Sequence, residues 1–115
     1  MKKIFSKSIE SVLLDIQLYN ELKVLGIIEN KTQLSRLCGK NDSYVRCMRA
    51  KGYGLHIGSL VVLIFNLTKL KRVETDTVRL FKLSEAQKTI QEIINEKCHL
   101  KHNYINYNQE EESEK

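Results

Sequence analysis

The first segment of this 115-residue chain carries apolar side chains at the three- and four-residue spacing of one helix face. The spacing predicts a helix over residues 8–25. Gly26 then supplies the left-handed backbone position that commonly ends a helix, and Ile27 can fold back onto the last turn. The positions expected on the apolar stripe are Ile9, Val12, Leu13, Ile16, Tyr19 and Leu22.

Two short helices are predicted next. Asn30 is a favourable N-cap and Gln33 follows three residues later, as in a capping box, so a helix is expected over residues 31–38 with Gly39 ending it. Asn41 or Asp42 can cap a further helix that runs to about residue 50. The inward positions of the two helices are Leu34, Leu37, Cys38, Val45 and Met48, with help from Tyr44.

The second half of the chain continues the helical period. After a glycine-bracketed loop over 52–58, a stripe of Leu60, Leu63, Ile64, Leu67 and Leu70 predicts another helix. Residues 76–97 follow as one helix or two, and a short strand over 78–83 fits the pattern as well. From about residue 103 the chain ends in a charge run that predicts a disordered acidic tail.

These elements predict an all-α protein, a compact bundle of about five helices. Three regions are expected: a core over 1–72, a C-terminal helical extension over 73–102 and the tail over 103–115. The extension carries a second stripe that serves either as core or as a dimerisation surface, namely Leu83, Ala86, Ile90, Ile93 and Ile94.

Charge is concentrated in one part of the chain. The formal net charge is +5, but residues 31–72 alone hold nine basic residues and one acidic residue, Asp42. A basic patch inside a folded region indicates an anionic partner, with nucleic acid as the first candidate, although an ordinary solvated face remains the alternative.

The passage from Lys31 to Ala50 resembles the helix-turn-helix of the Cro and phage-repressor (Xre-type) superfamily, within a wider match over about residues 8–72. Ser35 is the small residue in the middle of the first helix, and Gly39 is the turn glycine. Lys40 departs from the pattern, because that family usually has an apolar residue there. The resemblance implies binding of double-stranded DNA.

Helix geometry then assigns contacts. If Val45 and Met48 point inward, the opposite arc of the helix faces the major groove, where Arg46 can bond guanine and Asp42 can accept from cytosine. Lysines and arginines on the flanks suit phosphates. The expected DNA-binding residues are Lys31, Gln33, Lys40, Asn41, Asp42, Ser43, Tyr44, Arg46, Cys47, Arg49 and Lys51.

The resulting hypothesis is a small transcriptional regulator of phage, plasmid or bacterial origin that occupies an operator as a homodimer. The alternative is a phage-type inhibitor or adaptor that presents the same scaffold to a protein or nucleoprotein partner. Three cysteines without disulfide-like spacing and the lack of a membrane-length apolar run favour a cytoplasmic protein.

Other chemistry is not expected. Cys98, His99 and His102 do not form a complete zinc ligand set. Only Cys38, Cys47 or His56 could complete it, and two of these already have roles in the helix-turn-helix pattern. No catalytic constellation is evident, so neither an enzyme nor a cofactor is predicted. The loop glycines, Gly52, Gly54 and Gly58, allow either a backbone approach to phosphate or simply a flexible turn.

Overall fold

Five helices make up the protein, for which a computed structural model describes the backbone of residues 2–113 and the side chains of residues 9–100. They are α1 (Lys2–Val24), α2 (Lys31–Leu37), α3 (Tyr44–Ala50), α4 (Ile57–Val73) and α5 (Thr77–Ser113). No strand occurs within 2–113, so the all-α class is confirmed. None of the helices in this described range is long and apolar enough to span a membrane.

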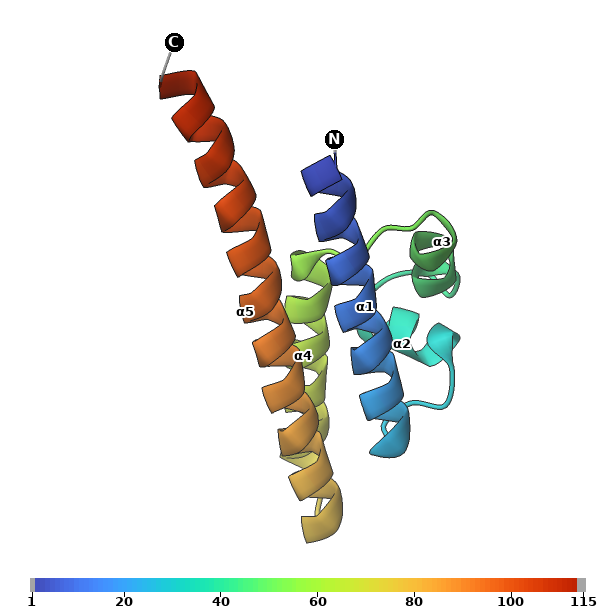
Figure 1. Ribbon diagram of the computed structural model, residues 1–115. Coiled ribbons are helices and arrows are strands. Elements are labelled where there is room, and N and C mark those ends of the chain that lie inside the picture. Colours follow the sequence, from blue (N-terminus) through green and yellow to red (C-terminus); the bar gives the residue numbers. More distant parts are fainter. Residues whose placement is uncertain (1, 114–115) are drawn as a thin grey trace.

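The three long helices form the body of the molecule. In Figure 1, α1, α4 and α5 run side by side, while α2 and α3 lie together on one side of α1 and α4. The helices α1 and α5 are antiparallel, because Lys97 of α5 bonds to Ser11 and Arg79 bonds to the carbonyl of Gly26. The chain therefore returns along its own first helix.

Two helix ends follow the predicted capping signals, but the cap expected for α3 from Asn41 or Asp42 is wrong, because the N-cap residue there is Ser43 and it makes no capping bond. Gly26 has φ of 74°, and the N–H of Ile27 donates to the carbonyl of Leu22, which ends α1. Asn30 Oδ1 accepts from the Gln33 N–H at 2.9 Å, which starts α2. The boundaries shift modestly, except that α1 begins at residue 2 and α5 runs on to residue 113.

The core contains side chains from all five helices. Leu18, Leu34, Val45, Leu63 and Ile90 are representatives of a single buried cluster. A bundle that buries one face of every helix needs no second core, so the region after residue 72 packs as part of the same unit.

The dimerisation surface predicted on the C-terminal stripe is wrong for this reason. The stripe lies on the inner face of α5 against α1 and α4, and it has no free surface to offer a partner. Its five members, Leu83, Ala86, Ile90, Ile93 and Ile94, are between 0 and 7% exposed. Of the two alternatives that the pattern left open, core packing is the one that the structure adopts.

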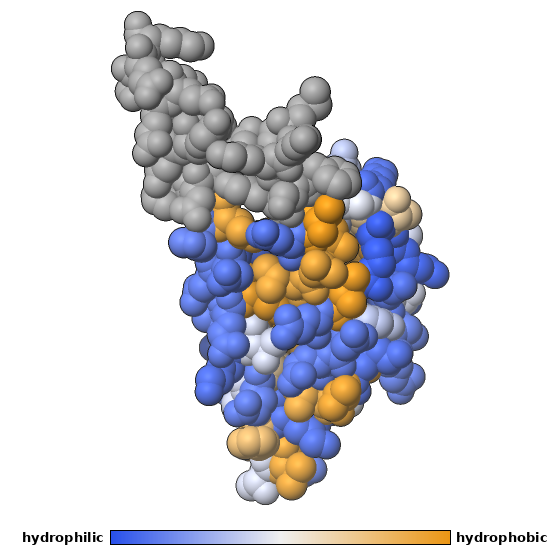
Figure 2. Space-filling model, viewed as in Figure 1, coloured by the Kyte–Doolittle hydropathy of each residue, from blue (hydrophilic) through white to orange (hydrophobic). Residues whose placement is uncertain are grey.

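The α1 stripe also needs correction. Leu22 is buried and Tyr19 half-buried, but Ile9 and Leu13 are 44% and 59% exposed. Apolar surface gathers along α1 and α5 in Figure 2. The inward face of α1 instead carries Leu18 and Asp15. Asp15 can be buried there because it pairs with Lys97 of α5. A pattern of apolar positions does not assign a charged residue such as Asp15 to the buried face, so the inward face of α1 was misassigned.

Three other sequence expectations differ from the structure. Leu70 is 39% exposed, since it lies near the end of α4. The segment 78–83 is helical, and residues 77–113 form one continuous helix. The segment expected as a disordered tail therefore belongs to α5 up to Ser113; residues 114 and 115, like the side chain of His102, lie outside the described part.

Candidate functional site

The helices α2 and α3 are joined by a six-residue connection, residues 38–43. Gly39 has φ of 73°, a left-handed conformation that residues other than glycine rarely adopt. The N–H of Lys40 donates to the carbonyl of Ser35, which closes the end of α2. Gly39 thus has the role expected from the sequence, and Lys40 is accommodated as an exposed residue after it.

Ser35 locks the two helices together. Its side chain is fully buried, and its Oγ donates to the Lys31 carbonyl at 2.9 Å and accepts from the Val45 N–H at 3.0 Å. Val45 lies in the first turn of α3, where backbone N–H groups lack helical partners. Ser43 is the N-cap residue of α3 and makes no capping bond, so Ser35 of α2 acts as the cap from outside.

The predicted orientation of α3 is confirmed. Val45 is 3% exposed and Met48 is half-buried against the core. The opposite side of the helix, which we call the outer arc of α3, is exposed and consists of Ser43, Arg46, Cys47 and Ala50. Lys40, Asn41 and Lys51 are exposed at its two ends.

Asp42 is paired with a residue that the sequence did not single out. Its two carboxylate oxygens accept from Arg36 Nε at 2.8 Å and from a terminal guanidinium nitrogen at 2.9 Å. The bonds from Arg36 lower the pKa of the Asp42 carboxyl, and the nearby Arg46 charge lowers it further. Each carboxylate oxygen keeps a second lone pair, so Asp42 can accept a further hydrogen bond, but only in the orientation that Arg36 imposes.

Two other predicted site residues have internal partners. The Tyr44 hydroxyl lies 3.0 Å from Ser59 Oγ and accepts from the His56 N–H at 3.2 Å, which ties α3 to the start of α4. Gln33 Oε1 accepts from the Glu29 N–H at 2.7 Å, so this side chain closes the N-terminus of α2. Both side chains are therefore hydrogen-bonded within the protein.

Three cations from three helices surround one tyrosine ring, a group that we call the Tyr19 cluster. Lys23 Nζ, Lys31 Nζ and the Arg49 guanidinium carbon lie 5.4, 5.9 and 5.5 Å from the centre of the Tyr19 ring. These distances suit cation–π attraction. The sequence predicted Lys31 and Arg49 but missed Tyr19 and Lys23, because Tyr19 was placed on the apolar stripe of α1.

A buried polar cluster, formed by Ser11, Asp15, Lys97 and the backbone of Leu55, joins α1, α5 and the loop after α3. Lys97 Nζ lies 2.8 Å from Asp15 Oδ1, donates to Ser11 Oγ at 2.7 Å and donates to the Leu55 carbonyl at 2.9 Å. The Leu55 N–H in turn donates to Asp15 Oδ2. The sequence gave no signal of this pairing, since the two charged residues are 82 positions apart.

The buried polar cluster decides how the glycine loop is used. A Cβ on Gly54 would collide with Ser11 Oγ and lie 3.0 Å from Lys97 Nζ, so this glycine permits a close approach of the loop to α1 and α5. The N–H groups of Leu55 and His56 donate to Asp15 and Tyr44. Two of the loop amides are therefore hydrogen-bonded within the protein and are not available to a phosphate.

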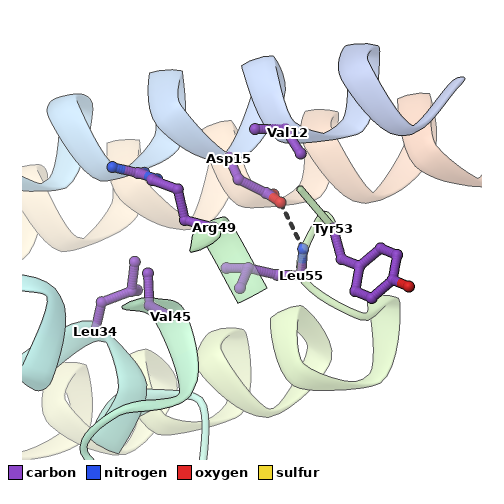
Figure 3. Close-up of a pocket in the computed structure, with 7 residues that line it drawn as sticks. All are labelled: Val12, Asp15, Leu34, Val45, Arg49, Tyr53 and Leu55. Carbon is purple, nitrogen blue, oxygen red and sulfur yellow. Dashed lines mark hydrogen bonds between the residues drawn. The ribbon is translucent and has the colours of Figure 1, made fainter. Parts of the chain in front are cut away.

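A small cleft opens between α1, α3 and this loop. Figure 3 shows Asp15 bonded to Leu55 at its wall, with the Tyr53 ring pointing away. Its volume is about 10 Å³, close to the space of one water molecule and far below the hundreds of Å³ of a substrate pocket. This cleft cannot hold a small-molecule substrate.

The thiols differ in their surroundings. Burial raises the pKa of Cys38 to about 12, so this thiol stays protonated and acts as a core residue. Cys47 and Cys98 are exposed. Among the side chains of residues 9–100, no group of three His, Cys, Asp or Glu residues is placed to hold a metal ion.

Comparison with known proteins identifies a family but no activity. The model of a family of unknown function, DUF6626, matches residues 16–113, and the chain belongs to this family. No curated protein and no solved structure matches the chain.

Proposed function

We propose that this chain binds duplex DNA sequence-specifically through the outer arc of α3. The observation that carries the proposal is the two-sided character of α3. Val45 is buried and bonded to Ser35, whereas Arg46 and Cys47 next to it face outward. A helix held to its protein by one side and exposed along the other fits the major groove of B-DNA.

Arg46 is the residue that we expect to read a base. It is exposed and, within residues 9–100, makes no hydrogen bond or ion pair, so its guanidinium is free to form a bidentate contact with guanine. Ser43 is exposed at the start of the arc and can bond a base or a phosphate. The Arg36–Asp42 pair lies beside the outer arc and links α2 to the connection that leads into α3.

The cations around the arc supply phosphate contacts. Lys40 and Lys51 lie at opposite ends of α3, and the Tyr19 cluster adds Lys23, Lys31 and Arg49 on the side of α1 and α2. No salt bridge neutralises these five side chains within residues 9–100. Uncompensated cations on both sides of a reading helix suit the two phosphate walls of a groove.

On this proposal the protein acts as a small transcriptional regulator that occupies an operator. The test begins with selection of bound duplexes from a random pool, followed by affinity measurements over a salt series. Five phosphate contacts predict a slope of log affinity against log salt of about −4.5, because each neutralised phosphate contributes roughly −0.9. A slope near zero would contradict DNA binding and favour a protein partner.

Arg46→Ala tests the base contact. We expect it to weaken the selected site by about 1–3 kcal/mol and to change random duplex much less. The matched control is Lys88→Ala, which removes one exposed cation from α5 and should leave both affinities unchanged. Equal losses on selected and random duplex would assign Arg46 to phosphate instead.

A further inference from the structure

One exposed side of α4, which we call its outward face, consists of Val61, Val62, Phe65, Lys69 and Arg72. Helical spacing places all five on one side of the helix. Its first half is apolar, because Val61, Val62 and Phe65 are 52, 39 and 56% exposed. An apolar surface on an exposed helix face that recurs at helical spacing indicates a contact with another molecule.

The second half of the outward face is cationic. Lys69 Nζ lies 4.7 Å from the centre of the Phe65 ring, and Arg72 is exposed further along the helix. Neither cation makes an ion pair within residues 9–100. The sequence of α4 contains no acidic residue, and the carboxylate of Glu74, which follows the helix, accepts from the Asp76 N–H. The two cations are therefore left for an external anionic group.

We propose that the outward face of α4 docks an acidic amphipathic helix of another protein. Such a helix places apolar anchors three and four residues apart along its target, and its acidic residues pair with Lys69 and Arg72. The proposal goes beyond DNA binding and does not rest on it, because the outward face of α4 and the outer arc of α3 belong to different helices.

Charge complementarity selects both the partner and its direction. The two cations lie toward the C-terminal end of α4, and acidic residues are most favourable in the first turns of a helix. A docked helix therefore runs antiparallel to α4, with its acidic first turns over Lys69 and Arg72 and its apolar residues over Phe65 and the two valines. A partner without acidic residues would leave both cations unpaired.

The apolar half of the face favours a protein over a nucleic acid. A phosphate would suit Lys69 and Arg72, but protein–DNA interfaces are polar, and three exposed apolar side chains gain nothing from a phosphate backbone. The face is also small beside the roughly 20–30 residues a side of a standard interface. It therefore fits one helix rather than a folded domain, and the complex is of the weak, transient class.

The experiment measures binding of a labelled synthetic peptide by fluorescence anisotropy, without DNA. The probe is as long as α4, 17 residues, with glutamates in its first turns and leucines three and four residues apart on one side. The wild-type chain should bind it saturably, and a peptide with lysines in place of the glutamates should bind at least about tenfold more weakly.

Phe65→Ala tests the apolar half of the face. It should weaken binding of the acidic peptide by about tenfold, because it removes the largest apolar side chain of the contact. The matched control is Phe81→Ala on α5, where the native ring is 64% exposed, and this variant should bind like the wild type. Equal losses in the two variants overturn the proposal.

A charge exchange tests the cationic half. The double variant Lys69→Glu with Arg72→Glu should lose the acidic peptide and bind the lysine peptide instead, because opposite charges again face each other. A gain of binding cannot arise from a chain that has failed to fold. A double variant that still prefers the acidic peptide, or a wild-type chain that binds no peptide up to the millimolar range, overturns the proposal.

NMR of the amide groups locates the peptide on the chain. A Cβ on Gly39 would lie 3.1 Å from Val62 Cγ1, so the face borders the α2–α3 connection, and we expect shifts at Gly39, Val62 and Phe65. Shifts confined to Lys31 and Arg46 would place the peptide on the DNA-binding surface and overturn the proposal. So would displacement of the peptide by random duplex, which would assign the face to nucleic acid. Absence of DNA binding by the wild type refutes the proposed function and leaves the peptide measurements unaffected.

Discussion

Two regions of this molecule use charged side chains in opposite ways. In the buried polar cluster, Lys97 finds Asp15, Ser11 and the Leu55 carbonyl within 3.0 Å, each on a different segment or turn. In the Tyr19 cluster, three cations share one ring and no acidic partner bonds them within residues 9–100. The first region satisfies its charges internally, whereas the cations of the second have no acidic partner in that range.

The energetics of the buried polar cluster indicate orientation rather than stability. Burial raises the pKa of Asp15 and lowers the pKa of Lys97, although each charge favours the ionised form of the other. Removal from water thus costs the pair more than mutual attraction returns, as is common for buried ion pairs. What the pair provides is a fixed position for the Leu55 backbone, and hence for the loop that leaves α3.

The largest effect is expected from breaking the buried pair. Lys97→Met leaves Asp15 buried without its cation, which should lower the free energy of unfolding by about 3–5 kcal/mol in denaturant titrations. Lys88→Met, at an exposed site on the same helix, is the control and should stay within about 0.5 kcal/mol of the wild type. Combining Lys97→Met with Asp15→Leu should recover part of the loss.

The pH dependence of the Lys97→Met variant follows from the Asp15 carboxyl. Its folded-state pKa is raised above the ordinary 3.8, so its contribution to stability is greatest below pH 3.8 and is lost as the pH rises through the folded pKa. In Lys97→Met, where the Lys97 charge no longer favours the ionised carboxylate, the loss of stability with rising pH should be larger than in the wild type. A Lys97→Met variant whose stability is independent of pH in that range would contradict the burial of the Asp15 carboxyl.

Crowding the loop against the buried polar cluster should have the next largest effect. Gly54→Ala places a Cβ against Ser11 and Lys97, and we expect a loss of about 1–3 kcal/mol in thermal or denaturant unfolding. Gly58→Ala is the control, because its Cβ meets nothing within 4 Å and the position lies in α4; it should stabilise by about 0.5–1 kcal/mol. Equal effects at the two glycines would refute the close approach.

On the α2–α3 side, Ser35→Ala should cost about 1–2 kcal/mol, because it removes the acceptor from the buried Val45 N–H. Ser43→Ala is the matched control. Although Ser43 is the N-cap residue of α3, it makes no capping bond, so its loss should change the unfolding free energy by less than about 0.5 kcal/mol. The reverse ranking would show that α3 is capped by Ser43 itself.

The smallest effect concerns the exposed Arg36–Asp42 pair. NMR titration should find the pKa of Asp42 below 3.8, and Arg36→Ala should raise it more than Arg46→Ala does, because the bonds from Arg36 are the main cause. Because the folded-state pKa is lowered, the pair stabilises the protein above pH 3.8, and this stabilisation is lost as the pH falls through the folded-state pKa. An unchanged pKa in Arg36→Ala would show that the pair does not form in solution.

Local signals in the sequence predicted the helices well because caps and turns act over a few residues. Asn30 and Gly39 are examples: a side-chain oxygen bonds an N–H three residues on, and a glycine adopts positive φ. The buried and exposed sides of α3 were also predictable. Once Val45 is placed inward, helical spacing places the outer arc on the opposite, exposed side. The sequence placed Tyr44 and Gln33 among the candidate DNA-binding residues but gave no signal of their bonding partners within the protein.

The sequence by itself predicted about five helices, the end of α1, the cap of α2 and a basic middle region, because backbone propensity and charge are properties of neighbouring residues. Only the tertiary structure decided that Asp15 faces inward, that the α5 stripe is core and that the apolar face of α4 points outward. The physical reason is the range of the interactions. Lys97 and Asp15 meet across 82 positions, and a pairing over such a distance leaves no periodic trace in either helix.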